Sequence, residues 1–226
     1  MTVTERGIWL HGTAHRKDLS AFTERALRLD PAAVVRLRER PSGTIVAWAA
    51  TGFDVLASRV IGGRVGPADL CVGADALLSG LTRMDDQGYV NPGFGMDSAW
   101  RGALPPDVGF IHLDDVPARV VLDLATQGLS LAKEHSSAHG PPASLLDQEV
   151  VAVNAGRDSV GIPMRCVFAL TAMGFLPDMP AADDVAPTSL GAEEMVRVRA
   201  MPAWLRIDAR FGTVYQRRGD PAVVLG

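Results

Sequence analysis

Lysine and cysteine are scarce in this 226-residue chain, and it lacks long apolar runs. Lys17 and Lys133 are its only lysines, so arginine supplies nearly all of the positive charge. The formal net charge of -4 argues against a broad electrostatic attraction to nucleic acid or to an anionic membrane. With 47% hydrophobic residues, the chain is nevertheless long enough to bury a substantial core. Nucleic acid is therefore not an expected partner.

The longest apolar stretch, residues 166–175, is about half of the roughly 18 to 20 residues that a membrane-spanning helix needs. The opening residues include Glu5 and Arg6 and do not resemble a signal peptide. We therefore expect a cytoplasmic protein without membrane contact.

Only two cysteines are present, Cys71 and Cys166, and both have apolar neighbours rather than metal-ligand spacing. They predict two buried free thiols. Two histidine pairs, His11 with His15 and His135 with His139, have the four-residue spacing of a metal site on a helix. The first pair precedes the expected helix cap, and the second leads into the Gly-Pro-Pro run at residues 140–142, so neither fits well in a helix. Because phosphate-binding glycine loops are also missing, we expect neither a metal nor another cofactor, and the missing nucleophile elbow gives serine hydrolysis no support.

The first 84 residues predict a helix followed by strands. Apolar residues recur at helical spacing between Asp18, which can cap the helix, and the Asp30–Pro31 pair, which should end it. Short turns then separate three strand-like runs, at residues 33–39, 44–51 and 53–61, which predict an antiparallel meander. A strand and helix within residues 70–81 complete this predicted αβ lobe, residues 1–84.

Residues 85–111 read as one long loop that is rich in glycine, proline and aromatic residues. Loops of this length inside compact domains are uncommon and are often functional. Residues 112–176 then predict a largely helical subdomain, with helices at residues 117–135, 145–153 and 163–173.

Residues 190–226 predict a second meander that joins the first lobe, with strands at residues 194–199, 204–211, 213–218 and 222–225. Its start at residues 196–202, VRVRAMP, matches VRLRERP at residues 35–41 and suggests an internal duplication. The predicted fold class is therefore α+β: N- and C-terminal antiparallel meanders forming one sheet system, with a helical subdomain between them.

His112, Asp114 and Asp115 form the densest cluster of catalytic residue types, at an expected strand-to-helix junction. Such a junction is a common active-site position, but a single helix-capping aspartate accounts for the cluster equally well. The long loop contributes Tyr89, Trp100 and Arg101 as candidate ligand-binding residues, and Arg165 is a further candidate for holding an anion. Trp100 has the alternative role of a core anchor.

Arginines alternate with apolar residues along both predicted meanders, which gives each sheet one buried and one wet face. They are Arg36, Arg38, Arg40, Arg197, Arg199, Arg206 and Arg210. This surface fits phosphate groups, an acidic partner or a second copy of the chain. It fits equally a solvated face paired locally with Glu39, Glu193 and Asp208.

Several short segments resemble conserved hypothetical proteins of actinobacteria that have no assigned function. They lie within residues 98–176 and comprise WRGALPP at 100–106, DVPA at 115–118, LLDQ at 145–148, PMRC at 163–166 and MGF at 173–175. The resemblance implies a cytoplasmic protein from a GC-rich bacterium, consistent with the arginine-rich composition, and it implies no activity or functional residue.

Three functional hypotheses follow from the sequence. The first is a non-catalytic binding or protein-interaction module, homodimeric or bound to another protein, because no coherent catalytic set is present. The second is a small-molecule enzyme that acts on an anionic substrate through the loop and the junction at residues 85–115. The third is a nucleic-acid-associated protein that uses the strand arginines.

Overall fold

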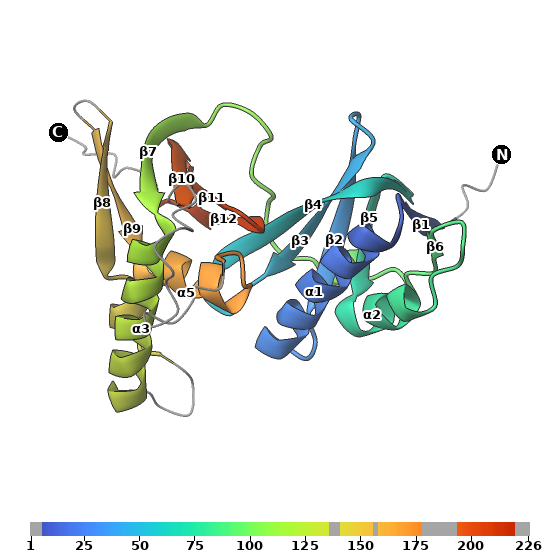
Figure 1. Cartoon of the computed structure of the whole chain (residues 1–226), viewed down its shortest axis with the longest axis horizontal. Coiled ribbons are helices and arrows are strands. Elements are labelled where there is room, and N and C mark those ends of the chain that lie inside the picture. The colour runs from blue at the N-terminus through green and yellow to red at the C-terminus, as the bar shows by residue number, and fades with distance from the viewer. Residues whose placement is uncertain (1–5, 136–140, 156–157, 178–193, 220–226) are drawn as a thin grey trace, which may run out of the picture. The chain divides into compact units, whose positions relative to one another are not determined.

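A computed structural model describes residues 6–135, 141–155, 158–177 and 194–219 of the chain (Figure 1). The chain divides into two compact units. The first comprises Met1–Gly52 and Leu56–Leu104, and the second comprises Phe53–Val55 and Pro105–Gly226.

The first unit is built on an antiparallel sheet with the strand order β5-β2-β3-β4. Strand β1 pairs with β4 on one side and with the short β6 on the other. In chain order the elements are β1 (Gly7–Leu10), α1 (Thr13–Leu29), β2 (Val34–Arg40), β3 (Thr44–Ala50), β4 (Val55–Gly66), β5 (Asp69–Gly73), α2 (Ala74–Thr82), β6 (Tyr89–Val90) and the 3-10 turn η1 (Asp97–Ala99).

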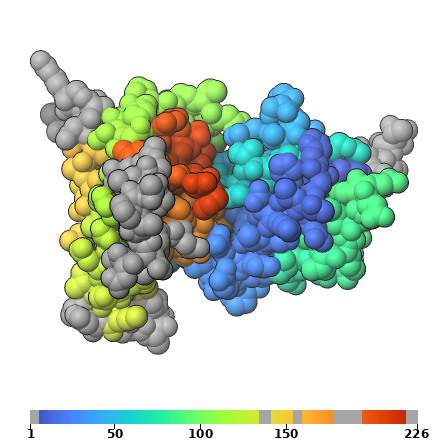
Figure 2. Space-filling view, in the orientation of Figure 1, coloured from blue at the N-terminus to red at the C-terminus, as the bar shows by residue number. Residues whose placement is uncertain are grey.

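Helices α1 and α2 pack beside each other and bury their apolar residues against this sheet (Figure 1). Leu19 and Phe22 of α1 and Leu37 of β2 are almost inaccessible to solvent. The outer sides of α1 (blue) and α2 (green) form much of the first unit's surface in Figure 2. The sheet therefore has one face buried under helices, as the alternating pattern along β2 predicts.

The second unit contains a four-stranded antiparallel sheet with the order β12-β11-β10-β7, and a separate β8–β9 hairpin. In chain order the elements are β7 (Ile111–Pro117), α3 (Ala118–His135), α4 (Ala143–Leu146), β8 (Glu149–Ala155), β9 (Asp158–Pro163), α5 (Met164–Ala172), β10 (Met195–Met201), β11 (Trp204–Ala209) and β12 (Gly212–Arg217). Helix α5 is apolar nearly all round, and its residues 164–170 are all buried.

The two predicted meanders are confirmed as antiparallel β2-β3-β4 and β10-β11-β12. The predicted strand at residues 222–225 lies outside the described residues. Whether both meanders share one sheet stays a prediction. In both units a helix precedes the meander, and the matching sequences at residues 35–41 and 196–202 lie in β2 and β10, the first strand of each. The duplication itself stays a prediction.

The helical prediction for residues 112–176 is wrong in part, because three strands lie there. The expected helix at residues 145–153 is only the four-residue α4, followed by β8. The run Val150–Val153 is apolar and β-branched, and such a run suits a strand paired with β9.

Helix α1 begins at Thr13, five residues before the predicted cap at Asp18. The Asp18 carboxylate instead accepts a hydrogen bond from Arg59 of β4 at 2.6 Å. The long loop at residues 85–111 is also more ordered than predicted, because it contains β6 and η1. None of the described helices is long and apolar enough to cross a membrane.

Candidate functional site

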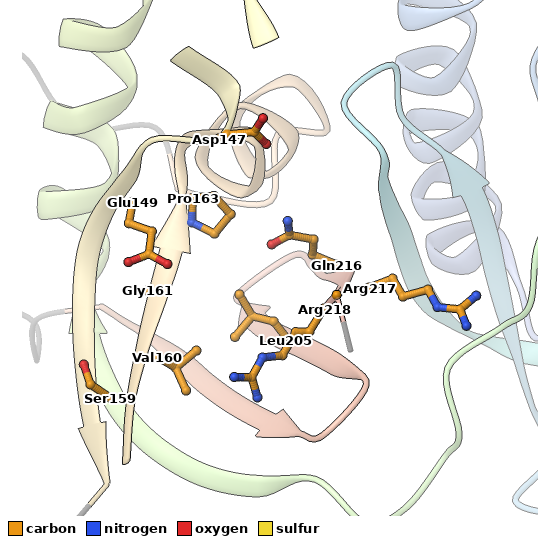
Figure 3. A pocket seen from close by; sticks show the side chains of 11 residues that line it. Asp147, Glu149, Ser159, Val160, Gly161, Pro163, Leu205, Gln216, Arg217 and Arg218 are labelled. Carbon is orange, nitrogen blue, oxygen red and sulfur yellow. The ribbon is translucent and has the colours of Figure 1, made fainter. Parts of the chain in front are cut away.

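A cavity of about 310 Å³ lies in the second unit, beside the β8–β9 hairpin and the end of β12 (Figure 3). In the described part of the chain, β9 pairs only with β8, so its other edge has no strand partner. The residues that line the cavity are Asp147, Glu149, Ser159, Val160, Gly161, Pro163, Leu205, Gln216, Arg217, Arg218 and Gly219.

Glu149 is the carboxylate of this cavity that is free to bind a ligand. It has no hydrogen-bond or ion-pair partner among the described residues, and its side chain extends from β8 toward Gly161 of β9 (Figure 3). A Cβ atom at residue 161 would lie 2.0 Å from the Glu149 carboxyl carbon. Glycine at position 161 therefore lets the carboxylate lie across the hairpin.

Asp147, the second acidic residue of the cavity, is bound by Arg165 of α5. The same guanidinium donates to the carbonyl oxygen of Phe53 at 2.8 Å and to Asp54 Oδ2 at 3.1 Å. Burial opposes the charged form of Arg165, but the hydrogen bonds that it donates to Asp147 and Asp54 raise its pKa above the ordinary value. We call this set the Arg165 clasp: Arg165, Phe53, Asp54 and Asp147.

The opposite wall of the cavity comes from the end of β12. The Cys166 thiol donates to Gln216 Oε1 at 3.4 Å, which fixes that amide above the core. Arg218 donates to the Met201 carbonyl at 3.3 Å, and Figure 3 shows its side chain beside Leu205. Val160 and Leu205 are buried and supply an apolar floor.

The cavity thus combines a carboxylate at one side, a guanidinium at the other and an apolar floor between them. Its volume is at the lower end of the range for ligand-binding pockets. An extended peptide segment suits this arrangement, because it offers main-chain hydrogen bonds to the open edge of β9 and charged side chains to Glu149 and Arg218.

The predicted cluster of His112, Asp114 and Asp115 lies on β7, not at a helix start. His112 Nε2 lies 3.1 Å from Asp115 Oδ1, and the same oxygen accepts from Arg197 at 3.3 Å. Asp114 accepts from the backbone N–H of Asp115, so neither aspartate caps α3. The three residues are together as predicted, but they lie outside the cavity described above.

Of the four candidate ligand-binding residues, Tyr89, Trp100 and Arg101 lie in the first unit and Arg165 lies in the second. Tyr89 of β6 contacts Trp9, with ring centroids 5.6 Å apart. Trp100 donates to the Gly102 carbonyl at 3.2 Å, and the Arg36 guanidinium lies 5.7 Å from its ring centroid. Arg101 is exposed.

The strand arginines are paired locally to a large extent. Asp208 accepts hydrogen bonds from Arg199, Arg206 and Thr213, as the solvated-face interpretation predicts for this aspartate. Arg36 pairs instead with Asp69. The hydrogen bonds that Arg36 donates to this carboxylate raise the pKa of the Arg36 guanidinium. Glu39 accepts the N–H of Val65 at 2.9 Å, and Glu193 lies outside the described residues.

Both cysteines are buried free thiols, as predicted. Burial raises the pKa of Cys71 to about 11 and that of Cys166 to about 12, so both stay protonated at neutral pH. His15 Nδ1 lies 3.2 Å from the Gly62 N–H, which donates to it. Among the residues that the structure describes, no three His, Cys, Asp or Glu side chains are grouped to hold a metal ion.

Sequence reasoning missed the cavity because its walls come from segments far apart in the chain. Glu149 was assigned to a helix, and the end of β12 carried no motif. A local signal was present in the apolar run at residues 150–153, which lies ahead of Gly156 and suits a strand as well as a helix.

Two family models match the chain, and together they cover most of it. Residues 3–102 match a domain of unknown function, DUF8010, and residues 105–221 match another, DUF8185. No curated protein matches the chain.

Solved structures of bacterial sliding clamps resemble the whole chain. They include the DNA polymerase sliding clamp of Caulobacter crescentus, with 11% identity, 96% of this chain and 67% of that chain covered, and a TM-score of 0.55. A putative DNA polymerase III beta subunit from Eubacterium rectale is 10% identical, with a TM-score of 0.57, and the match covers 97% of this chain and 66% of that chain. The beta subunit from DNA polymerase of Streptococcus pyogenes is 10% identical, with a TM-score of 0.57, and the match covers 96% of this chain and 65% of that chain.

At these identities the likeness shows the fold alone, and the chain spans about two thirds of the length of the clamp chains. Its fold is therefore similar to that of a sliding clamp. The match over residues 105–221 covers more than half of the sequence, and the chain belongs to the DUF8185 family of domains of unknown function.

Proposed function

We propose that this protein is a non-catalytic, clamp-like interaction protein that associates with itself and binds an extended segment of a partner protein. The observation that carries the proposal is the likeness to sliding clamps over 96% of the chain. Those neighbours include a putative beta subunit and a beta chain of DNA polymerase III.

The β7 edge is the surface that best supports self-association. In the described part of the chain β7 is hydrogen-bonded to a strand only on its β10 side. Ile111 at its start is 69% exposed, and Val108 just before it is 79% exposed. An open strand edge with exposed apolar residues is a template for pairing with another chain. A second copy of β7 is the partner that we propose for it.

Light scattering coupled to size-exclusion chromatography tests this proposal. The wild-type protein should elute with the mass of a dimer or higher oligomer, and Ile111→Lys should shift it toward the monomer because a charge at the edge opposes pairing. Val60→Lys is the matched control, since Val60 is a similarly exposed β-branched residue on a strand of the first unit. A wild-type monomer at high micromolar concentration contradicts self-association.

The cavity beside β9 is the proposed site for the partner segment. An extended peptide would add a strand to the open edge of β9 and place a lysine or arginine on Glu149. Selection of random heptapeptides displayed on phage should enrich basic residues on the wild-type protein and lose that enrichment on Glu149→Gln. Recovery of the same peptides on both proteins contradicts the role of Glu149.

A DNA-associated role is the second candidate, and the likeness to DNA polymerase sliding clamps favours it. The formal charge of -4 disfavours tight binding through the surface as a whole, so a clamp-like protein of this kind must rely on local basic patches. Fluorescence anisotropy with a labelled DNA duplex at rising salt is the test. Binding that weakens steeply with salt supports this role, and no binding at low salt removes it.

An enzymatic role has less support from the geometry. His112 and Asp115 form a hydrogen-bonded pair on an exposed strand, and Asp115 is shared with Arg197. Activity lost on His112→Ala and retained on Asp114→Ala would favour this alternative over the interaction protein.

A further inference from the structure

Three residues form a row across three neighbouring strands of the first unit. Trp9 of β1 is opposite Arg64 of β4 on one side and opposite Tyr89 of β6 on the other. The Arg64 guanidinium carbon lies 3.9 Å from the Trp9 ring centroid, and the Tyr89 ring is tilted against Trp9 at 54°. We call Arg64, Trp9 and Tyr89 the Trp9 row.

The backbone around the row holds its rings in place. Gly7, two residues before Trp9 and therefore on the same face of β1, has no side chain, and the Tyr89 ring fills that space: a Cβ atom there would lie 2.4 Å from the ring. The Asp85 carboxylate accepts the Tyr89 N–H at 2.8 Å, and the Tyr89 hydroxyl donates to the Arg6 carbonyl at 3.4 Å. The row is therefore pre-organised before any partner arrives.

The positive charge of the Trp9 row is on Arg64, and no acidic side chain of the described first unit pairs with it. Arg64 is exposed and has no hydrogen-bond or ion-pair partner among the described residues, while Trp9 and Tyr89 are half-buried. Stacking on an indole fixes the plane of the guanidinium but leaves its N–H groups free. Those N–H groups match a carboxylate in a bidentate geometry.

We propose that the Trp9 row is a docking surface for an extended segment of a partner protein that carries an aspartate or glutamate next to an apolar side chain. The carboxylate pairs with Arg64, and the apolar side chain packs on Trp9 and Tyr89. Tryptophan, tyrosine and arginine are the residue types that carry most binding energy at protein interfaces. A nucleic-acid strand fits less well, because the formal net charge of -4 opposes a row of phosphates more than it opposes a segment with one or a few carboxylates.

This surface is distinct from the cavity of the second unit, so either proposal can fail without the other. The test uses two fluorescein-labelled heptapeptides, one of alternating glutamate and leucine and one with glutamine in place of each glutamate. Fluorescence anisotropy should show the glutamate peptide binding at least about tenfold more tightly, since hydrogen bonds to charged groups contribute that much.

Arg64→Gln should raise the dissociation constant of the glutamate peptide by about tenfold or more, and Trp9→Leu should weaken it as well. Arg38→Gln is the matched control, because Arg38 is also exposed in the first unit and has no ion-pair partner among the described residues. Arg38→Gln should leave the dissociation constant of the glutamate peptide within about twofold of the wild-type value. Arg64 is exposed, so its replacement should not unfold the chain, and circular dichroism checks this for all variants.

Three results would overturn the proposal. The first is equal binding of the two peptides, or no binding of the glutamate peptide at millimolar concentration. The second is an equal loss of affinity for the glutamate peptide in Arg38→Gln and Arg64→Gln, which would show a general effect of the protein's charge. The third is tighter binding of a labelled eight-nucleotide oligothymidine that depends on Arg64, which would assign the row to nucleic acid.

Discussion

Replacing Arg165 with methionine should destabilise the second unit strongly. Methionine keeps an unbranched apolar side chain at this position of α5 and removes the guanidinium. The change therefore breaks the hydrogen bonds to Phe53, Asp54 and Asp147 with little loss of packing.

The magnitude follows from the environments of the three partners. Hydrogen bonds to charged groups contribute about 1.5 to 3 kcal/mol each, and breaking a buried ion pair costs about 3 to 5 kcal/mol. The Asp54 side chain is 95% exposed and that of Asp147 is 65% exposed, so both carboxylates regain water when the arginine is lost. Asp54 also has a φ of 56°, and its release from a left-handed conformation returns some free energy. We therefore expect a loss of about 2 to 4 kcal/mol.

Urea unfolding followed by tryptophan fluorescence is the assay. Trp204 is the only tryptophan within residues 105–226, so Phe replacements of Trp9, Trp48 and Trp100 leave one reporter in the second unit. Arg165→Lys keeps the charge but loses the planar fork of donors, and it should cost about half as much as methionine.

Arg101→Met is the matched control for this experiment. Sequence reasoning made both Arg101 and Arg165 candidate ligand-binding residues. Arg101 is exposed, and its replacement should change the free energy of unfolding by less than about 0.5 kcal/mol. If Arg165→Met behaves like this control, the clasp does not hold the unit together and the reasoning from its contacts is wrong.

Three further predictions concern packing, alkaline stability and the shared aspartate. Gly80→Ala should cost about 1 to 3 kcal/mol despite alanine's helix propensity, because its Cβ would lie 2.1 Å from the Asn91 carbonyl oxygen; Gly52→Ala, with open space around it, should be neutral in the same thermal unfolding assay. Burial raises the pKa of Cys166 to about 12, so the neutral thiol stabilises the fold fully below pH 9 and this contribution is lost as the pH rises toward 12. Urea midpoints at pH 8 and pH 10.5 should therefore fall less in Cys166→Ala than in the wild type. Asp208→Ala should cost about 1 to 3 kcal/mol, measured by urea unfolding, because two arginines lose their common acceptor; an unchanged midpoint would refute this.

Local pattern was sufficient for the elements whose partners are close in sequence. Alternation along residues 34–40 and 195–201 predicted the strands β2 and β10, because the buried face of a sheet repeats every second residue. The continuous apolar run of residues 166–173 predicted a helix buried on most sides. The apolar neighbours of Cys71 and Cys166 likewise predicted their burial.

Local pattern failed where a distant partner decides the structure. The apolar residues 150–153 suit a helix or a strand, and pairing with β9 made them a strand. Asp18 has the right chemistry for a helix cap, but Arg59 of β4 is 2.6 Å away and binds it instead. Asp114 or Asp115 was predicted to cap a helix, but pairing with β10 holds both in the strand β7.

The sequence by itself thus determined the two meanders, the buried helix α5 and the buried thiols, because each depends on a repeat or an apolar run within one segment. Only the tertiary structure decided what Arg165, Glu149 and Tyr89 contact. Phe53 reaches Arg165 from 112 positions away, and Trp9 meets Tyr89 across neighbouring strands. Charge pairing and ring packing depend on distances of a few ångströms, and chain folding sets those distances between residues that share no local pattern.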